Sequence, residues 1–194
     1  MRTLTITSSR SLRNLYLTRT LVQLIWAFGI ILTAPTQPQF AAILLILYPL
    51  WDVACTLYDF KTTGQAGLAR TSQIINVALG VATALGIALT VFNQPAYAIA
   101  IFGGWALGAG LLQLLVGLIR RSQLGGQWAM ILSGGQSMAA GIAFVLGGLS
   151  GKLHMKDIGG YAVFGAIYFL VGAILLSRKL SRIGSVEDGA GVAA

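Results

Sequence analysis

The segment "GIILTAPTQPQFA" (29–41) recurs as "GIALTVFNQPAYA" (86–98), and this repetition decides how the chain is organised. Each copy ends one apolar run, passes through a short polar link with Gln and Pro, and begins another apolar run. Gly, Ile, Leu, Thr, Gln, Pro and Ala match at an offset of 57 residues, from Gly29 to Gly86. A short link between two long apolar runs predicts a tight helical hairpin.

A third, weaker copy starts at "GIAFVLG" (141–147) and resumes at "YAVFGA" (161–166), after extra residues that include His154. Each copy is expected to start and end on the same side of a membrane. The copies are then parallel repeats, related by a pseudo-axis along the membrane normal. The predicted fold is all-α: a polytopic membrane protein with six transmembrane helices, arranged as three parallel helical-hairpin repeats.

Composition sets the class of protein. Apolar residues make up 56% of the chain and charged residues 9%, with a mean hydropathy of +0.81, which excludes an ordinary water-facing surface. A bilayer core of about 30 Å requires spans of about 20 residues. We predict spans near 16–34, 38–58, 72–92, 95–119, 127–149 and 158–178.

The predicted organisation is a single membrane domain with two short ends. Residues 1–14 are expected to form a basic cytoplasmic N-terminus and residues 181–194 a disordered cytoplasmic tail. Residues 15–180 would form the six-helix domain, with hairpins at about 15–58, 72–119 and 127–178.

The net charge of +8 does not indicate nucleic-acid binding, because the cations lie between apolar runs and act as topology signals. When successive links alternate sides, Lys152 and Lys156 fall on one side and the other eleven Lys and Arg residues on the opposite side. This predicts a multi-pass protein of the bacterial cytoplasmic (inner) membrane with both termini in the cytoplasm. The lipid bilayer is the expected partner, and a homo-oligomer or a membrane protein partner stays open.

Polar residues inside the spans are the candidate site. In "YPLWDVACTLYD" (48–59), Asp52 is expected at the depth of Arg19 in the preceding span, so the two are predicted partners. The repeat aligns Asn76 with Arg19 and Gln113 with Thr56, and Tyr48 shares the Asp52 face. The predicted intramembrane polar layer contains Arg19, Tyr48, Asp52, Thr56, Gln73, Asn76 and Gln113. Asp59 is expected at the cytoplasmic end, in water.

Two interpretations of Asp52 remain open. In the first, Asp52 pairs with Arg19 and the layer fixes the register and rotation of the helices. In the second, the layer lines a wet cavity in which Asp52 gains and loses a proton, since an ionisable residue inside a membrane is by default a functional candidate.

Rows of small residues suggest how the spans pack, because close backbone approach at Gly and Ala drives helix association in lipid. We expect packing faces at these positions: Ala78, Ala82 and Gly86; Gly104 and Gly108; Gly135 and Ala139; Ala162 and Ala166.

Catalysis is not expected. No nucleophile with a base, no His-rich metal set and no glycine-rich phosphate loop is present. Cys55 reads as a small buried apolar residue and His154 as a solvated loop residue. We therefore predict no catalytic residues, no bound metal and no cofactor.

The three short repeats, the run "FGGWALGAGLLQLLVG" (102–117) and the run "QWAMILSGGQSMAAGIAFVL" (127–146) resemble the HdeD-type bacterial membrane proteins, a family of short repeats. The resemblance covers about residues 15–180. It implies a small inner-membrane protein of a family whose biochemistry is unsettled and whose namesake is linked to acid resistance, with no established catalytic residues. Asp52 lies outside the generic repeat, because Ala109 and Ala173 stand at the equivalent positions.

The sequence leaves three classes of function. The favoured one is a non-enzymatic HdeD-type protein in stress (acid) resistance or envelope maintenance. The alternative is a small proton- or cation-responsive transporter or channel that uses the Asp52 layer, and a membrane-embedded enzyme is a distant third.

Overall fold

The structure, a computed structural model, describes the backbone of residues 2–64, 66–121 and 127–192. Within these ranges the chain is helical, without strands. The helices are α1 (Arg2–Thr33), α2 (Pro38–Thr63), α3 (Gly67–Thr90), α4 (Pro95–Arg120), α5 (Trp128–Leu149) and α6 (Met155–Val192). Each of the six contains a segment long and apolar enough to cross a membrane. The prediction of an all-helical chain with six candidate spans is therefore confirmed.

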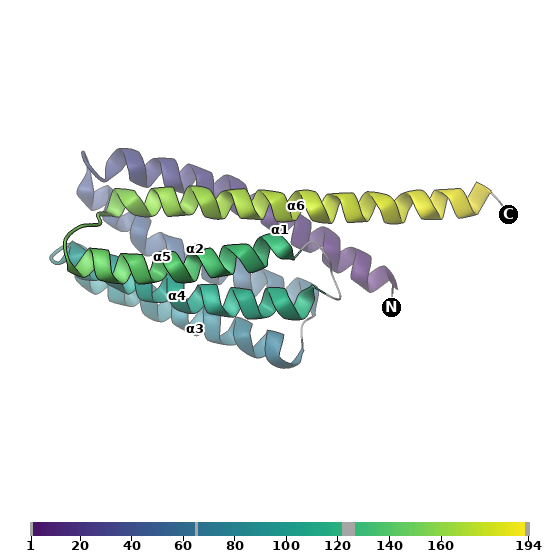
Figure 1. The fold of residues 1–194 in the computed structure, drawn as a ribbon, viewed down its shortest axis with the longest axis horizontal. Coiled ribbons are helices and arrows are strands. Elements are labelled where there is room, and N and C mark those ends of the chain that lie inside the picture. Colours follow the sequence, from purple (N-terminus) through teal and green to yellow (C-terminus); the bar gives the residue numbers. More distant parts are fainter. Residues whose placement is uncertain (1, 65, 122–126, 193–194) are drawn as a thin grey trace.

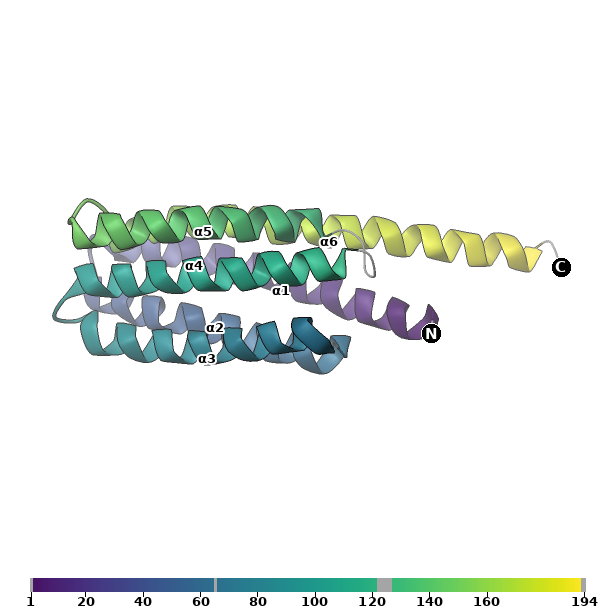
Figure 2. The same cartoon turned by 60° about the horizontal axis from the view of Figure 1, so that its bottom comes forward.

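The helices lie side by side along one axis, and both termini are at the same end of the bundle (Figures 1 and 2). We call this the terminal end. The turns at 34–37, 91–94 and 150–154 lie at the opposite end, the turn end. At the terminal end, α1 and α6 extend beyond the other helices.

The first two turns have the same geometry. The Gln37 N–H donates to the carbonyl of Thr33, and the Gln94 N–H donates to the carbonyl of Thr90, both at 2.7 Å. Gln37 has φ −137° and ψ 67°, and Gln94 has φ −139° and ψ 66°. In both turns a proline follows at the first helical position, where its missing N–H needs no partner. The third turn differs, with a left-handed glycine, Gly151, at φ 70°.

The closest packing joins α4 to α5 and α1 to α6, which belong to different predicted hairpins. Glycines make the α4–α5 contact possible. A Cβ on Gly141 would stand 2.5 Å from the Leu107 backbone nitrogen and 2.6 Å from the Gly103 carbonyl oxygen. One on Gly134 would stand 2.7 Å from the carbonyl oxygen of Gly110. These helices touch backbone to backbone, as small residues allow in membranes.

Several predicted packing positions are wrong, whereas Gly86 faces Ile101 of α4 and Gly108 faces Leu79 of α3. A Cβ on Gly104 or Gly135 would meet nothing within 4 Å, and Ala78, Ala82 and Ala139 are exposed. The contact between α4 and α5 instead uses the neighbouring positions, Gly103 in place of Gly104 and Gly134 in place of Gly135. Gly- and Ala-rich helices contain several such rows, and spacing alone does not select one. On α6 the prediction is confirmed, since Ala162 and Ala166 are fully buried.

The two ends of the chain also differ from expectation. The backbone of α1 is helical from Arg2, within the segment expected to be a separate basic N-terminus. The backbone of α6 stays helical to Val192, through most of the segment expected to be disordered. No proline interrupts either segment, so the strongest helix breaker is absent from both, although the second contains the glycines Gly184, Gly189 and Gly191. Residues 193 and 194 of that tail lie outside the described residues.

An aromatic core fills the half of the bundle nearer the turn end. Phe102 is fully buried, and the rings of Tyr48, Trp105, Phe144 and Tyr161 have centroids 5.2–5.9 Å from its own. Such edge and tilted contacts are the favoured geometries for ring pairs. This core closes the bundle on one side of the polar residues.

Candidate polar cavity

Asp52 of α2 is held by side chains from two other helices, α1 and α3. Its Oδ1 forms an ion pair with Arg19 of α1, the contact predicted from their common depth. Its Oδ2 accepts a hydrogen bond of 2.7 Å from the Nδ2 of Asn76 on α3. The same Asn76 amide donates to Thr56 Oγ1 at 3.0 Å. Both oxygens of the carboxylate are therefore occupied by protein donors.

Arg19 has a second partner on its flat face. The centre of its guanidinium lies 4.3 Å from the centroid of the Phe169 ring on α6, within the range of cation–π attraction. This contact keeps Arg19 over the bundle interior. Arg19 thus joins α1, α2 and α6 at one level.

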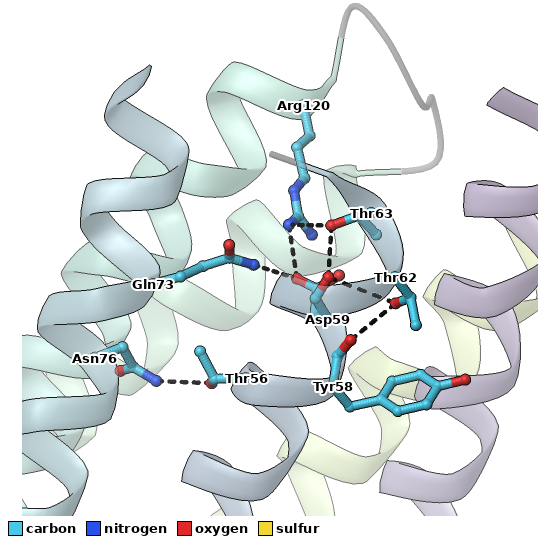
Figure 3. A network of polar contacts seen from close by, with 8 residues as sticks. All are labelled: Thr56, Tyr58, Asp59, Thr62, Thr63, Gln73, Asn76 and Arg120. Carbon is cyan, nitrogen blue, oxygen red and sulfur yellow. Dashed lines mark hydrogen bonds and ion pairs between the residues drawn. The ribbon is translucent and has the colours of Figure 1, made fainter. Parts of the chain in front are cut away.

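A second ion pair lies closer to the terminal end. The Nη2 of Arg120 on α4 donates to Asp59 Oδ2 at 2.6 Å, and the Nε2 of Gln73 on α3 donates to the same oxygen at 2.7 Å. Figure 3 shows these two side chains approaching the Asp59 carboxylate from different helices. The Arg120 side chain is 3% exposed and that of Asp59 13% exposed. The expectation that Asp59 sits in water is therefore wrong.

This second pair was missed because each member had a simpler explanation. Asp59 stands near the end of α2, and Arg120 ends α4, where cations normally mark the cytoplasmic side. One signal was available in the sequence. Asp59 lies two turns beyond Asp52 on the same helical face, and the next span carries Gln73, a predicted member of the polar layer. Only the approach of α4 to α2 shows that Arg120 covers it.

The other predicted layer residues do not join the carboxylates. Gln113 donates from its Nε2 to the carbonyl of Met130 on α5 at 3.2 Å, so it links α4 to α5. Tyr48 packs its ring against Trp26, with centroids 4.3 Å apart, as part of the aromatic core. Gln23, which lies nearer the middle of α1, donates to the carbonyl of Ala162 at 2.9 Å. The predicted single layer is therefore two carboxylate clusters and several separate interhelical links.

Both carboxylate clusters line one partly open cavity of about 120 Å³ between the helices. Its walls extend from Tyr48, Trp105 and Tyr161 at the aromatic core to Asp59 and Arg120 near the terminal end. For comparison, an engineered apolar cavity of about 150 Å³ holds one benzene molecule. The space therefore matches a molecule of a few non-hydrogen atoms.

The cavity walls hold buried polar atoms without a hydrogen-bond partner. Among the residues that the structure describes, seven side-chain atoms are in this state, and all belong to residues that line the cavity: Arg19 Nε, Trp51 Nε1, Asp59 Oδ1, Gln73 Oε1, Asn76 Oδ1, Trp105 Nε1 and Arg120 Nε. Buried polar atoms in proteins nearly always have a partner, and an unpaired one costs about 1–3 kcal/mol. Ordered water or a small polar ligand in this cavity would supply partners to those atoms that face it.

The remaining chemistry-bearing residues lie outside this arrangement. Cys55 is a free thiol that is only 2% exposed. The His154 side chain is 68% exposed at the turn end, with its Nδ1 3.8 Å from Asp157 Oδ2. In the part of the chain that the structure describes, no group of three or more His, Cys, Asp or Glu residues is placed to hold a metal ion.

No protein-family model, no curated protein and no solved structure matches the chain.

Proposed function

We propose that this chain is a non-enzymatic membrane protein that takes a small polar solute into the cavity between its spans, as a small transporter or channel does. The observation that carries this proposal is the set of seven unpartnered polar atoms around one cavity, beside two ion pairs. The ion pairs alone are weak evidence of a stabilising role, since replacing a buried ion pair by apolar residues is often neutral or stabilising.

The depth of the charges supports the same conclusion. A charged side chain at the centre of a membrane helix costs about 2.5–3.5 kcal/mol on insertion scales, and such residues usually mark substrate or ion pathways. Asp52 and Arg19 lie well inside their candidate spans, Pro38–Thr63 and Thr7–Thr33. Their pairing reduces the cost, but the unpartnered atoms beside them remain.

The test is flux through liposomes that contain the purified full chain. Proton and cation flux would be followed with an entrapped pH dye across a pH step, and uptake of small uncharged and zwitterionic solutes by osmotic swelling. We expect flux of at least one solute class with the wild type and its loss in a folded Asp52→Asn variant. Wild-type flux no greater than that of empty liposomes for every class would refute the proposal.

A role in acid-stress resistance of the HdeD type is the second candidate. One observation favours it: the turns at 34–37 and 91–94 share their backbone hydrogen bonds and dihedral angles at the offset of the sequence repeat. This supports the first two copies of the repeat on which the resemblance rests, and the proposal of three parallel hairpins adds the weaker third copy in the sequence. Deleting the gene in the source bacterium should lower survival of acid shock. Unchanged survival would remove this candidate.

We also propose that both termini face the cytoplasm of a bacterial inner membrane. The support is the charge asymmetry, because Lys152 and Lys156 flank the third turn while the other basic residues belong to segments nearer the terminal end. A green fluorescent protein fused to the C-terminus should fluoresce in cells, and an alkaline phosphatase fused there should be inactive. The reverse pattern would overturn this orientation.

A further inference from the structure

Basic side chains at the terminal end begin where the exposed apolar surface of the outer helices stops. Among the described side chains, the last exposed large apolar residue toward that end is Leu17 on α1 and Ile174 on α6. Arg10 lies two turns beyond Leu17, and Arg178 lies one turn beyond Ile174. Both arginines are exposed. One helical turn, about 5.4 Å, beyond the last lipid-facing residue reaches the lipid headgroups, so these cations belong to the membrane surface.

The packing of α1 against α6 brings these two arginines to one level. A Cβ on Gly172 would stand 3.0 Å from the Tyr16 ring, so Gly172 and Tyr16 are opposite each other. The two helices run in opposite directions (Figure 1). Six residues further toward the terminal end stand Arg10 on α1 and Arg178 on α6. Like charges at one level repel each other, and an anion bound beside both removes the repulsion.

The corner between α2 and α3 has the same arrangement. Gln73 on α3 is hydrogen-bonded to Asp59 on α2. Two residues further along α2 stands Lys61, and three residues back along α3 stands Arg70, so their levels differ by about one residue, or about 1.5 Å. The Arg70 guanidinium lies 5.3 Å from the centroid of the Phe60 ring, which holds it against α2. Lys61 and Arg70 are both exposed.

No acidic side chain in the described part of the chain balances these four cations. Asp52 is paired with Arg19 and Asp59 with Arg120, whereas Asp157 lies at the turn end. None of the four exposed cations forms an ion pair with a described residue. The two corners therefore carry uncompensated positive charge at the membrane surface, which is the charge that an anionic headgroup neutralises.

We propose that these two corners, α1–α6 and α2–α3, bind the headgroups of anionic phospholipids. Each corner presents two cations to one phosphodiester, and the guanidinium of arginine can donate two parallel hydrogen bonds to it. Tyr58, 47% exposed and one turn deeper than Lys61, and Trp128, 63% exposed, are the aromatic residues expected at a membrane interface. The proposal concerns the surface of the bundle and does not depend on the cavity or on transport.

The first test is thermal unfolding of the full chain in an uncharged detergent. The single cysteine, Cys55, is buried, so a thiol-reactive fluorogenic dye reports unfolding. Phosphatidylglycerol, phosphatidylcholine and free glycerol phosphate would each be titrated. Phosphatidylglycerol should raise the midpoint by about 5 °C near saturation, the other two by much less, and about 0.5 M salt should weaken the effect. An equal shift with phosphatidylcholine or glycerol phosphate, or no shift with phosphatidylglycerol, would overturn the proposal.

The second test assigns the lipid effect to the two corners. Arg10→Gln with Arg178→Gln removes the cations of one corner, and Lys61→Gln with Arg70→Gln removes those of the other. Without lipid, both double variants should be about as stable as the wild type, because each loses a repulsion between like charges. Their affinity for phosphatidylglycerol, measured from the unfolding midpoint, should fall about tenfold or more, since each basic residue near an anionic surface contributes about fivefold.

The matched control is Lys152→Gln with Lys156→Gln, which removes the same amount of charge at the turn end. This variant should bind phosphatidylglycerol as the wild type does. An equal fall in the control, or unchanged affinity in both corner variants, would refute the proposal. Unchanged affinity in one corner variant alone would remove that corner as a binding site.

Discussion

The half of the bundle next to the turn end and the half next to the terminal end differ in what fills the space between the helices. Aromatic rings around Phe102 fill the first, together with buried aliphatic and alanine side chains. Two ion pairs, amides and a cavity lie in the second, beside a smaller apolar cluster that includes Leu12, Phe169 and Leu176. Lipid is as apolar as a protein core, so the first half gains from close packing and the second from interhelical hydrogen bonds.

The two halves of the bundle are suited to different roles, one to holding the helices together and the other to contact with solutes. Close-packed interiors tolerate changes of side-chain volume poorly, whereas a cavity leaves room for water or a small ligand. We expect the aromatic half to hold the spans together and the polar half to be the part that interacts with solutes. Four sets of variants test this division, in order of decreasing effect on stability.

The largest loss of stability should come from Gly141→Leu, which places a side chain into the α4–α5 contact beside the aromatic core. The added side chain meets backbone atoms of Leu107 and Gly103, which cannot move without separating the helices. We expect a loss of at least about 3 kcal/mol or a failure to fold, seen as loss of the monodisperse peak in size-exclusion chromatography. Gly135→Leu is the matched control, because a Cβ there meets nothing within 4 Å. Equal damage from both variants would contradict the α4–α5 packing.

Phe102→Ala should be next. This ring is fully buried at the centre of the aromatic cluster, and its removal leaves a void that costs about 3–5 kcal/mol. The unfolding midpoint in detergent should fall accordingly. Phe164→Ala removes a ring that is 58% exposed and should change the midpoint little. If the two variants behave alike, the aromatic half is not the main support.

Asp52→Asn should have a smaller effect in the polar half. It leaves Arg19 without its counter-charge, and because both side chains are about 15% exposed, the loss should be about 2–3 kcal/mol. Adding Arg19→Gln should recover part of the loss, since no unpaired charge then remains. Thermal unfolding of the single and double variants measures the recovery. A double variant no more stable than the single one would rule out a stabilising pair.

Gly64→Ala should have the smallest effect. Gly64 ends α2 in the left-handed region, at φ 59° and ψ 36°, where a Cβ costs about 1 kcal/mol. The unfolding midpoint should fall by a few degrees. Gly160→Ala, at a helical position with open space around it, should not lower stability. A destabilised Gly160→Ala with an unaffected Gly64→Ala would contradict this account of the α2 end.

Much of the fold could be predicted from the sequence. The spans predicted near 38–58 and 95–119 begin with helices α2 and α4 at Pro38 and Pro95. The length of an apolar span depends only on consecutive residues, and a proline at the first helical position fixes the helix start at that turn. Both are local properties that the sequence shows directly. The partnership of Arg19 and Asp52 was also predictable, because a single short turn joins their helices and places them at one depth.

Other features depend on contacts between distant segments. The pairing of α4 with α5 and of α1 with α6 depends on which row of glycines or alanines faces a neighbour, and the sequence contains several equivalent rows. The Asp59–Arg120 pair joins residues on α2 and α4 that no local pattern connects.

The sequence by itself determined that this chain has six apolar helical segments, where the first two turns fall, and which polar residues lie within the spans. Only the tertiary structure decided how each helix is rotated, that the predicted layer divides into two carboxylate clusters, and that both face one cavity. The reason is physical: span length and turn chemistry are set by adjacent residues, whereas rotation and cavity shape depend on the packing of all six helices together.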